Sequence, residues 1–172
     1  TATNNTTQDT SEFFTPSPPS APLFSLNQAT NDPTPLIKGT AELGTDIKLE
    51  VDLDQDGNGD FSYLANTNGS GEWQVNLETA LPEGQTSAIS PISDSTVSFS
   101  AIASVNNLTS VPTAFDLNVD STSPTVTLNS SSPKTTNAPV TVNATSSETV
   151  TGFEESDLTI ANGTISNFSG SG

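Results

Sequence analysis

The segment of residues 52–60, DLDQDGNGD, concentrates the side chains of this 172-residue chain that are best suited to bind a metal ion. Carboxylates alternate along it, and Gly57 permits the tight turn that brings alternate side chains to one point. A set of clustered oxygen donors is what hard divalent cations prefer, and Ca²⁺ above all. The predicted ligands are Asp52, Asp54, Asp56 and Asp60, together with the backbone carbonyl of Asn58.

The same loop differs from an EF-hand. Its first, third, fifth and sixth positions match the EF-hand pattern, but Tyr63 stands at the twelfth position in place of a bidentate glutamate. The flanking residues alternate as strands do, so we expect a calcium loop between two strands. The alternative is an acidic hairpin turn whose Asp and Gly residues serve backbone geometry alone. Four aspartates in nine residues repel one another unless a cation lies between them, which favours calcium.

Two other groups of side chains invite a chemical interpretation. Trp73 and Tyr63 could form a platform for stacking a sugar, but Trp73 shares a face with apolar neighbours and is better explained as a core residue. Glu154, Glu155 and Asp157 could suggest glycoside hydrolysis, which needs two carboxyl groups facing each other across a cleft. Nothing in the sequence argues for such a cleft, so we expect no catalytic residues.

The composition excludes several classes of function. The chain has no His and no Cys, so it cannot hold a Ser-His-Asp or Cys-His nucleophile, a zinc site of the usual ligands or a disulfide. Twenty acidic residues against three basic ones give a net charge of −17, so nucleic-acid binding is excluded and contact with an anionic membrane surface is disfavoured. No stretch is long and apolar enough to span a bilayer, and no signal peptide is recognisable.

The elements that must position the acidic loop are β-strands. Apolar and polar residues alternate in five runs, separated by turn-forming Gly, Asn, Asp and Pro, and no window has a helical period. Short strands at this spacing predict an antiparallel β-sandwich. We expect its core to contain Ile47, Leu49, Val51, Trp73, Val75, Leu77, Phe99, Phe115 and Leu117.

The pattern divides the chain into three parts. Residues 1–32 contain several prolines and little periodicity, which predicts a linker or the end of a preceding module, although Phe13, Phe14 and Phe24 could dock on a neighbour. Residues 33–121 form the sandwich with the acidic loop. Residues 122–172 carry further strand-like runs but are too few to bury a core, so we expect a second, incomplete domain. Because the chain begins with Thr1, we expect it to be a piece of a larger protein.

Several short motifs resemble bacterial immunoglobulin-like (Big) repeats of large calcium-dependent surface adhesins. They are PLIKGTAELGTDIKLEVD, GEWQVNL, STVSFSAIAS and TAFDLNVDSTSPTV, and the sequence from Ser123 onward is similar to a second repeat type. The resemblance implies an all-β, Ig-like sandwich, followed by a truncated Ig-like domain. It also implies that acidic residues near repeat junctions, here Glu42 and Asp120, could hold interdomain calcium. The asparagines of the turn at residues 104–108 replace acidic residues of many repeats and weaken that second site.

The function that the resemblance implies is structural. We expect a non-enzymatic stalk module of an extracellular, bacterial cell-surface adhesin, in which calcium stiffens a rod that serves adhesion or biofilm formation. Its partners would be neighbouring Ig-like repeats of the same chain, with host or surface glycans and proteins bound by other regions. The alternatives are an accessory or carbohydrate-binding sandwich of a secreted enzyme, and a subunit of an extracellular filament or surface layer.

Overall fold

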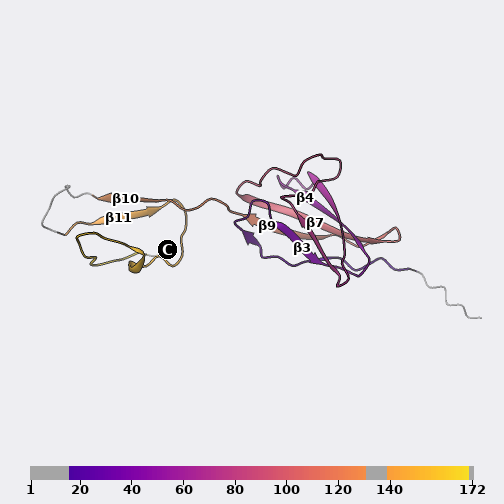
Figure 1. The fold of residues 1–172 in the computed structure, drawn as a ribbon, viewed down its shortest axis with the longest axis horizontal. Coiled ribbons are helices and arrows are strands. Elements are labelled where there is room, and N and C mark those ends of the chain that lie inside the picture. Colours follow the sequence, from indigo (N-terminus) through magenta and orange to yellow (C-terminus); the bar gives the residue numbers. More distant parts are fainter. Residues whose placement is uncertain (1–15, 131–138, 171–172) are drawn as a thin grey trace, which may run out of the picture. The chain divides into compact units, whose positions relative to one another are not determined.

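The alternating runs of the sequence form strands in the computed structural model, which describes residues 16–130 and 139–170 (Figure 1). The chain divides into two units after Ser121. The strands of the first unit are β1 (Leu23–Phe24), β2 (Ala29–Thr30), β3 (Leu36–Thr40), β4 (Asp46–Asp52), β5 (Phe61–Asn66), β6 (Glu72–Asn76), β7 (Ser95–Val105), β8 (Leu108–Thr109) and β9 (Thr113–Val119). The second unit contains β10 (Val126–Ser130), β11 (Val142–Ser146) and the 3₁₀ turn η1 (Glu155–Asp157).

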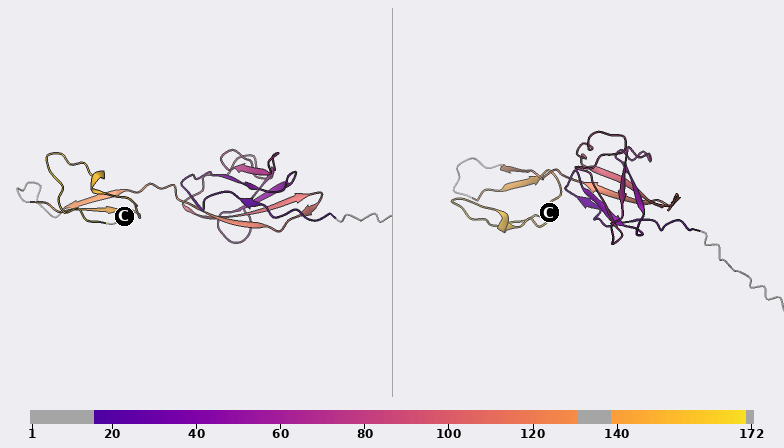
Figure 2. Two further views of the ribbon diagram at one scale, coloured as in Figure 1. Left: turned by 90° about the horizontal axis from the view of Figure 1, so that it is seen from below. Right: turned by 45° about the vertical axis from the view of Figure 1, so that its right-hand side comes forward.

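The first unit is a sandwich of two sheets, whose layers can be followed in Figure 2. One sheet has the order β1-β3-β6, and the other has the order β2-β9-β7-β4-β5 with β8 paired to β7. Neighbouring strands are antiparallel except β2 and β9, which are parallel. The all-β, Ig-like sandwich expected from the sequence is confirmed. Within the described ranges, no helix is long and apolar enough to cross a membrane.

The register of β4 places the acidic loop at one end of the larger sheet. β4 lies between β5 and β7, and its last residue, Asp52, is opposite Ser98 of β7. β9 is the other neighbour of β7, where Val119 is opposite Ser95. The loop that follows β4 and the end of β9 therefore lie at the same end of the sandwich.

The core lies between the two sheets and is built from the inward positions of both. Strand β4 shows the alternation most clearly, because Ile47, Leu49 and Val51 are completely buried while their neighbours face outward. Eight of the nine predicted core residues are buried, and Phe115 is only partly buried. The ring of Phe115 stacks on Phe24 with 5.1 Å between ring centroids. The predicted set also omitted Ile37, Tyr63, Ile89, Ile92, Val97, Ala101, Ala103 and Val119, which are buried as well.

The prediction of a linker over residues 1–32 differs from the structure in its second half. β1 pairs with β3, and β2 pairs with β9, so residues 23–30 extend both sheets. Phe24 packs edge-on against Trp73 as well as on Phe115, which explains why this proline-rich segment is ordered. Phe13 and Phe14 lie outside the described residues.

The second unit pairs two strands and buries little. β10 and β11 form an antiparallel ladder in which Leu128 is opposite Ala144. None of its described residues is buried as a whole, and Val126, Leu128 and Val142 are each more than half exposed. The strand-like runs around Ile160 and Ile165 do not form strands. Positive φ angles at Asn162 and Asn167 interrupt the extended backbone there.

Candidate metal centre

The acidic loop connects β4 to β5 and is closed by its own hydrogen bonds. The backbone N–H of Asp60 donates to the carbonyl of Val51 at 2.8 Å, which continues the pairing of the two strands. Between these ends the chain curls through positive φ angles at Gln55 (58°) and Gly57 (89°). Glycine adopts this conformation at no steric cost, so the curl rests mainly on Gly57. Strands flank the loop on both sides, unlike the helices of an EF-hand.

Three carboxylates converge in the curl. One oxygen each from Asp52, Asp54 and Asp60 lie within 4.8 Å of one another. Asp52 accepts the N–H of Gly57 on Oδ2 at 2.9 Å, and Asp60 accepts the N–H of Leu53 on Oδ2 at 2.8 Å. The second oxygen of Asp52, Oδ1, is buried and has no hydrogen-bond partner. A buried carboxylate oxygen without a donor is costly, and a cation between the three carboxylates would satisfy it.

Asp56 is positioned differently from the other predicted ligands. Its Oδ1 accepts both the backbone N–H of Asn58 at 2.7 Å and the side-chain amide of Asn58 at 3.1 Å. Its own N–H donates to Asp54 Oδ1 at 3.2 Å. Asp56 does not belong to the converging group and instead holds the turn around Asn58, as an aspartate in an Asx-turn does.

A chain of side-chain hydrogen bonds fastens the loop to the larger sheet. Gln55 Nε2 donates to Ser98 Oγ of β7 at 3.2 Å, and Ser98 Oγ donates to Asp116 Oδ1 of β9 at 2.7 Å. Sequence reasoning missed all three residues as supports of the loop. The alternation of β7 places Ser98 on the outward face, but only the register shows that it lies beside Asp52.

Glu42 and Asp120 lie at opposite ends of the first unit. Glu42 precedes β4, which begins opposite Ser104, whereas Asp120 follows Val119, which is opposite Ser95. Most of β7 separates these ends, which is roughly 30 Å at about 3.3 Å per residue. The two carboxylates therefore cannot hold one ion within this unit. The N–H of Ser20 donates to Glu42 Oε1 at 2.7 Å and lowers the pKa of that carboxyl.

The other sequence candidates do not form sites. Trp73 and Tyr63 are only 2% and 1% exposed, so they cannot offer a stacking surface to a sugar. Glu154 and Asp157 cap the η1 turn, where the N–H of Glu154 donates to Asp157 Oδ2 at 2.9 Å. These carboxylates face their own backbone and not each other across a cleft.

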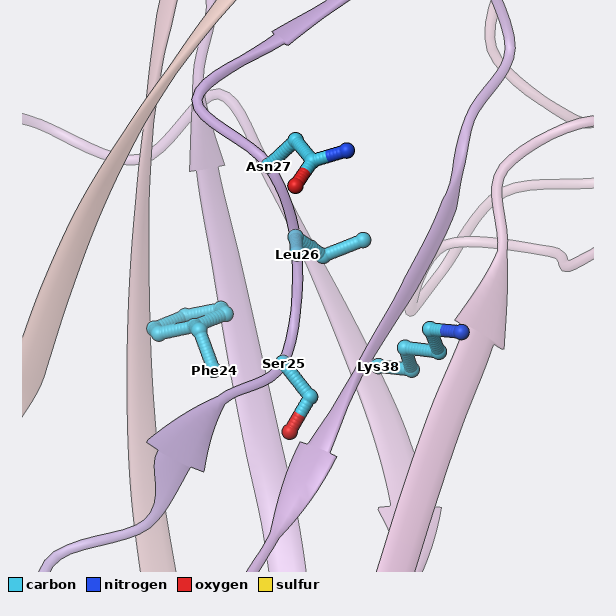
Figure 3. Close-up of a pocket in the computed structure, with 5 residues that line it drawn as sticks. All are labelled: Phe24, Ser25, Leu26, Asn27 and Lys38. Carbon is cyan, nitrogen blue, oxygen red and sulfur yellow. The ribbon is translucent and has the colours of Figure 1, made fainter.

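Two hollows of the described surface contain no pair of opposed carboxyl groups. One of about 590 Å³ is lined by Phe24, Ser25, Leu26, Asn27 and Lys38, and Figure 3 shows the Phe24 ring and the Lys38 side chain extending away from each other. A neighbouring hollow of about 550 Å³ shares Ser25 and Lys38 and contains one carboxylate, Glu72. Neither holds two carboxyl groups in opposition.

Comparison with known proteins found a family match over the second unit. Residues 120–172 match the model of a family described as a bacterial Ig-like domain. The resemblance to bacterial Ig-like repeats is thus confirmed for this part of the chain.

One solved structure is similar over more of the chain. It is described as a tetra-tandem repeat in the extending region of a large adhesion protein, and it is 16% identical with a TM-score of 0.41. The similarity covers 74% of this chain but 31% of that one, so this chain spans less than a third of its length. The comparison with curated proteins found no match.

Proposed function

We propose that this chain is a non-catalytic stalk module of a bacterial cell-surface adhesin, located outside the cell. The observation that carries the proposal is a β-sandwich followed directly, in the same chain, by a unit that matches a bacterial Ig-like domain. Consecutive β-units of this kind suit a spacer whose partners are neighbouring repeats of the same chain. Binding of glycans or proteins on a host or another surface, and any role in biofilms, would belong to other regions of the protein.

We further propose that the acidic loop binds a structural Ca²⁺ ion through Asp52, Asp54 and Asp60. Support comes from the convergence of these carboxylates within 4.8 Å and from the buried, unpartnered Oδ1 of Asp52. In this proposal Asp56 and the side-chain amide of Asn58 shape the turn, and coordination by the backbone carbonyl of Asn58 stays a prediction. Mg²⁺ should substitute poorly, because it demands tighter octahedral geometry and releases water reluctantly.

The position of the loop in the fold suggests how a bound calcium ion would stabilise the first unit. The loop lies at the end of the sandwich where β9 finishes, and Gln55, Ser98 and Asp116 connect it to that strand. A bound ion would convert mutual repulsion of the carboxylates into attraction and would order this end of the unit. The expected affinity is that of extracellular modules, a Kd of about 10⁻⁴–10⁻³ M.

Two substitutions in the same loop test the calcium proposal. Asp54→Ala removes a converging carboxylate and should weaken Ca²⁺ binding by at least about tenfold, the equivalent of about 1.4 kcal/mol. Asp56→Ala removes the same charge from a residue outside the group and should weaken binding by less than about threefold. Isothermal titration calorimetry of the wild type and both variants measures the difference.

The matched charge of the two variants makes the result decisive. A general electrostatic effect of the loop would reduce affinity equally in both, whereas coordination affects Asp54→Ala selectively. Absence of Ca²⁺ binding by the wild-type chain would show that the loop is only an acidic turn.

The stalk proposal is tested separately by the complete coding sequence and by glycan binding. Further Ig-like repeats on either side of this chain would support the stalk, whereas a flanking catalytic domain would favour an accessory module of a secreted enzyme. We expect the chain to bind no glycan on an array. Binding there would contradict the spacer role and favour a carbohydrate-binding module.

A further inference from the structure

Three Asn-Gly pairs occur in the described chain, and their asparagines differ in hydrogen bonding. They are Asn58–Gly59 in the acidic loop, Asn68–Gly69 in the turn between β5 and β6, and Asn162–Gly163 in the second unit. Glycine has no Cβ, so it leaves its own backbone nitrogen accessible and the backbone free to rotate. Such a nitrogen can attack the side-chain carbonyl of the preceding asparagine when both groups are free to meet.

Two of the three asparagines are held away from this reaction. Asn68 Oδ1 accepts the N–H groups of Ser70 at 2.8 Å and Glu72 at 3.0 Å, and its Nδ2 donates to Glu72 Oε2 at 2.9 Å. Asn58 donates both its backbone N–H and its side-chain amide to Asp56. In each case the amide must break hydrogen bonds before its Cγ can approach the following nitrogen.

Asn162 has no such restraint. Asn162 and Gly163 are both exposed, and no hydrogen bond joins any residue from 159 to 170 to another part of the described structure. Asn162 has a φ of 60°, a left-handed conformation that an L-residue adopts at a cost, and no hydrogen bond of the described chain fixes it. The side-chain amide and the Gly163 nitrogen can therefore reach geometries that the other two pairs cannot.

We propose that Asn162–Gly163 is a site of spontaneous succinimide formation in the folded protein. The backbone nitrogen of Gly163 gives its proton to solvent base and forms a bond to Cγ of Asn162. The Cγ–Nδ2 bond breaks, and the side-chain nitrogen leaves as ammonia. Water then opens the five-membered ring at either carbonyl, which yields aspartate or isoaspartate at position 162. The product carries one additional negative charge, and the isoaspartate form adds a methylene to the backbone.

The experiment compares the three pairs within one molecule. The full chain is incubated at mildly alkaline pH, folded or in concentrated urea, and conversion at each asparagine is followed by peptide mass spectrometry with detection of isoaspartate. Three ordinary hydrogen bonds would lower the population of the released Asn68 amide by roughly a hundredfold, so we expect Asn162 to convert at least about tenfold faster than Asn68 in the folded chain. In urea the rates should become similar.

Two controls define the outcomes. Asn162→Gln should abolish the fast conversion, because its longer side chain must close a six-membered ring, while Trp73 fluorescence reports that the first unit stays folded. Equal rates at Asn162 and Asn68 in the folded chain would overturn the proposal. A difference that persists unchanged in urea would overturn it as well, because the cause would then be local sequence and not structure.

Discussion

The carboxylate of Asp52 shows how one residue combines folding with a prospective binding role. Its Oδ2 accepts the N–H of Gly57 and closes the curl, while its Oδ1 is buried without a donor. The first contact stabilises the turn whether or not an ion is bound. The second leaves a negative oxygen that water cannot solvate, so the apo loop carries a cost that a cation would remove.

Tyr63 also has a buried polar atom without a hydrogen-bond partner, but no ligand is proposed for it. Its side chain is almost completely buried, its hydroxyl has no hydrogen-bond partner, and burial raises its pKa. Tyr63→Phe removes the unsatisfied hydroxyl and keeps the ring, so we expect the free energy of unfolding to rise by about 1 kcal/mol. Chemical denaturation monitored by Trp73 fluorescence measures the change.

The raised pKa of Tyr63 also predicts a response to alkali. The folded state holds the phenolic proton more tightly than the unfolded state. The resulting contribution of protonated Tyr63 to the free energy of unfolding is complete below pH about 10, and it is lost as the pH rises through the folded pKa. Wild type should therefore lose more stability above pH about 10 than Tyr63→Phe. Because Tyr63 is the one tyrosine of the chain, phenolate absorbance reports it directly. Parallel losses in both proteins would contradict the assignment.

At the scale of elements, the contact between β1, β3 and β6 depends on Gly39. A Cβ at this position would lie 1.9 Å from the carbonyl oxygen of Leu23 and 2.7 Å from the Trp73 ring. Neither can give way, because one is backbone and the other is packed in the core. Gly39→Ala should therefore destabilise the first unit by about 1–3 kcal/mol, through displacement of β1 or of Trp73.

Gly69→Ala is the matched control for this substitution. Nothing lies within 4 Å of a Cβ at Gly69, and its φ is not positive. The melting temperature of Gly69→Ala should stay close to that of the wild type, whereas that of Gly39→Ala should be several degrees lower. The expected shift is about 4–8 °C for each kcal/mol of lost stability in a domain of this size. Equal melting temperatures for the two variants would show that β1 does not pack on Gly39 as described.

The sequence predicts the long strands better than it predicts the short strands or the burial of individual side chains. Period-two alternation identifies β4, β6 and β7, because burial on one face leaves a direct trace in the residue pattern. The short strand β1 leaves none, since two residues cannot show a period. Phe115 alternates like a core residue but is only partly buried, and the alternation does not show that its covering neighbour is Phe24 of β1.

The candidate site also contains residues that the sequence predicts and residues whose role only the structure shows. Spacing alone indicated the carboxylates of Asp52, Asp54 and Asp60, because alternate residues of a curled chain point to one centre. It could not separate Asp56, whose carboxylate turns toward Asn58, since that choice depends on local hydrogen bonds. It also could not find Ser98, which reaches the loop only through the register of β4 and β7.

At the scale of the whole molecule, the two units differ in how they are stabilised. Every residue of the buried core belongs to the first unit, and the described side chains of the second unit are exposed or only partly buried. A chain ending at Ser121 should therefore unfold at the same denaturant midpoint as the full chain when Trp73 fluorescence is followed. A midpoint lowered by truncation would show that the second unit contributes to the stability of the first.

The measurement that tests the central claim most directly is thermal unfolding of the full chain at a saturating free Ca²⁺ of about 10–100 mM, which is about 100 times the expected Kd, and in excess chelator. At a free calcium of about 100 times the Kd, binding contributes about 2.7 kcal/mol. A first unit of this size should then melt roughly 10 °C higher in calcium. Asp54→Ala should lose at least about half of this difference, and Asp56→Ala should keep most of it. If the wild type melts at the same temperature in both buffers, the acidic loop is a turn and calcium does not stabilise this module.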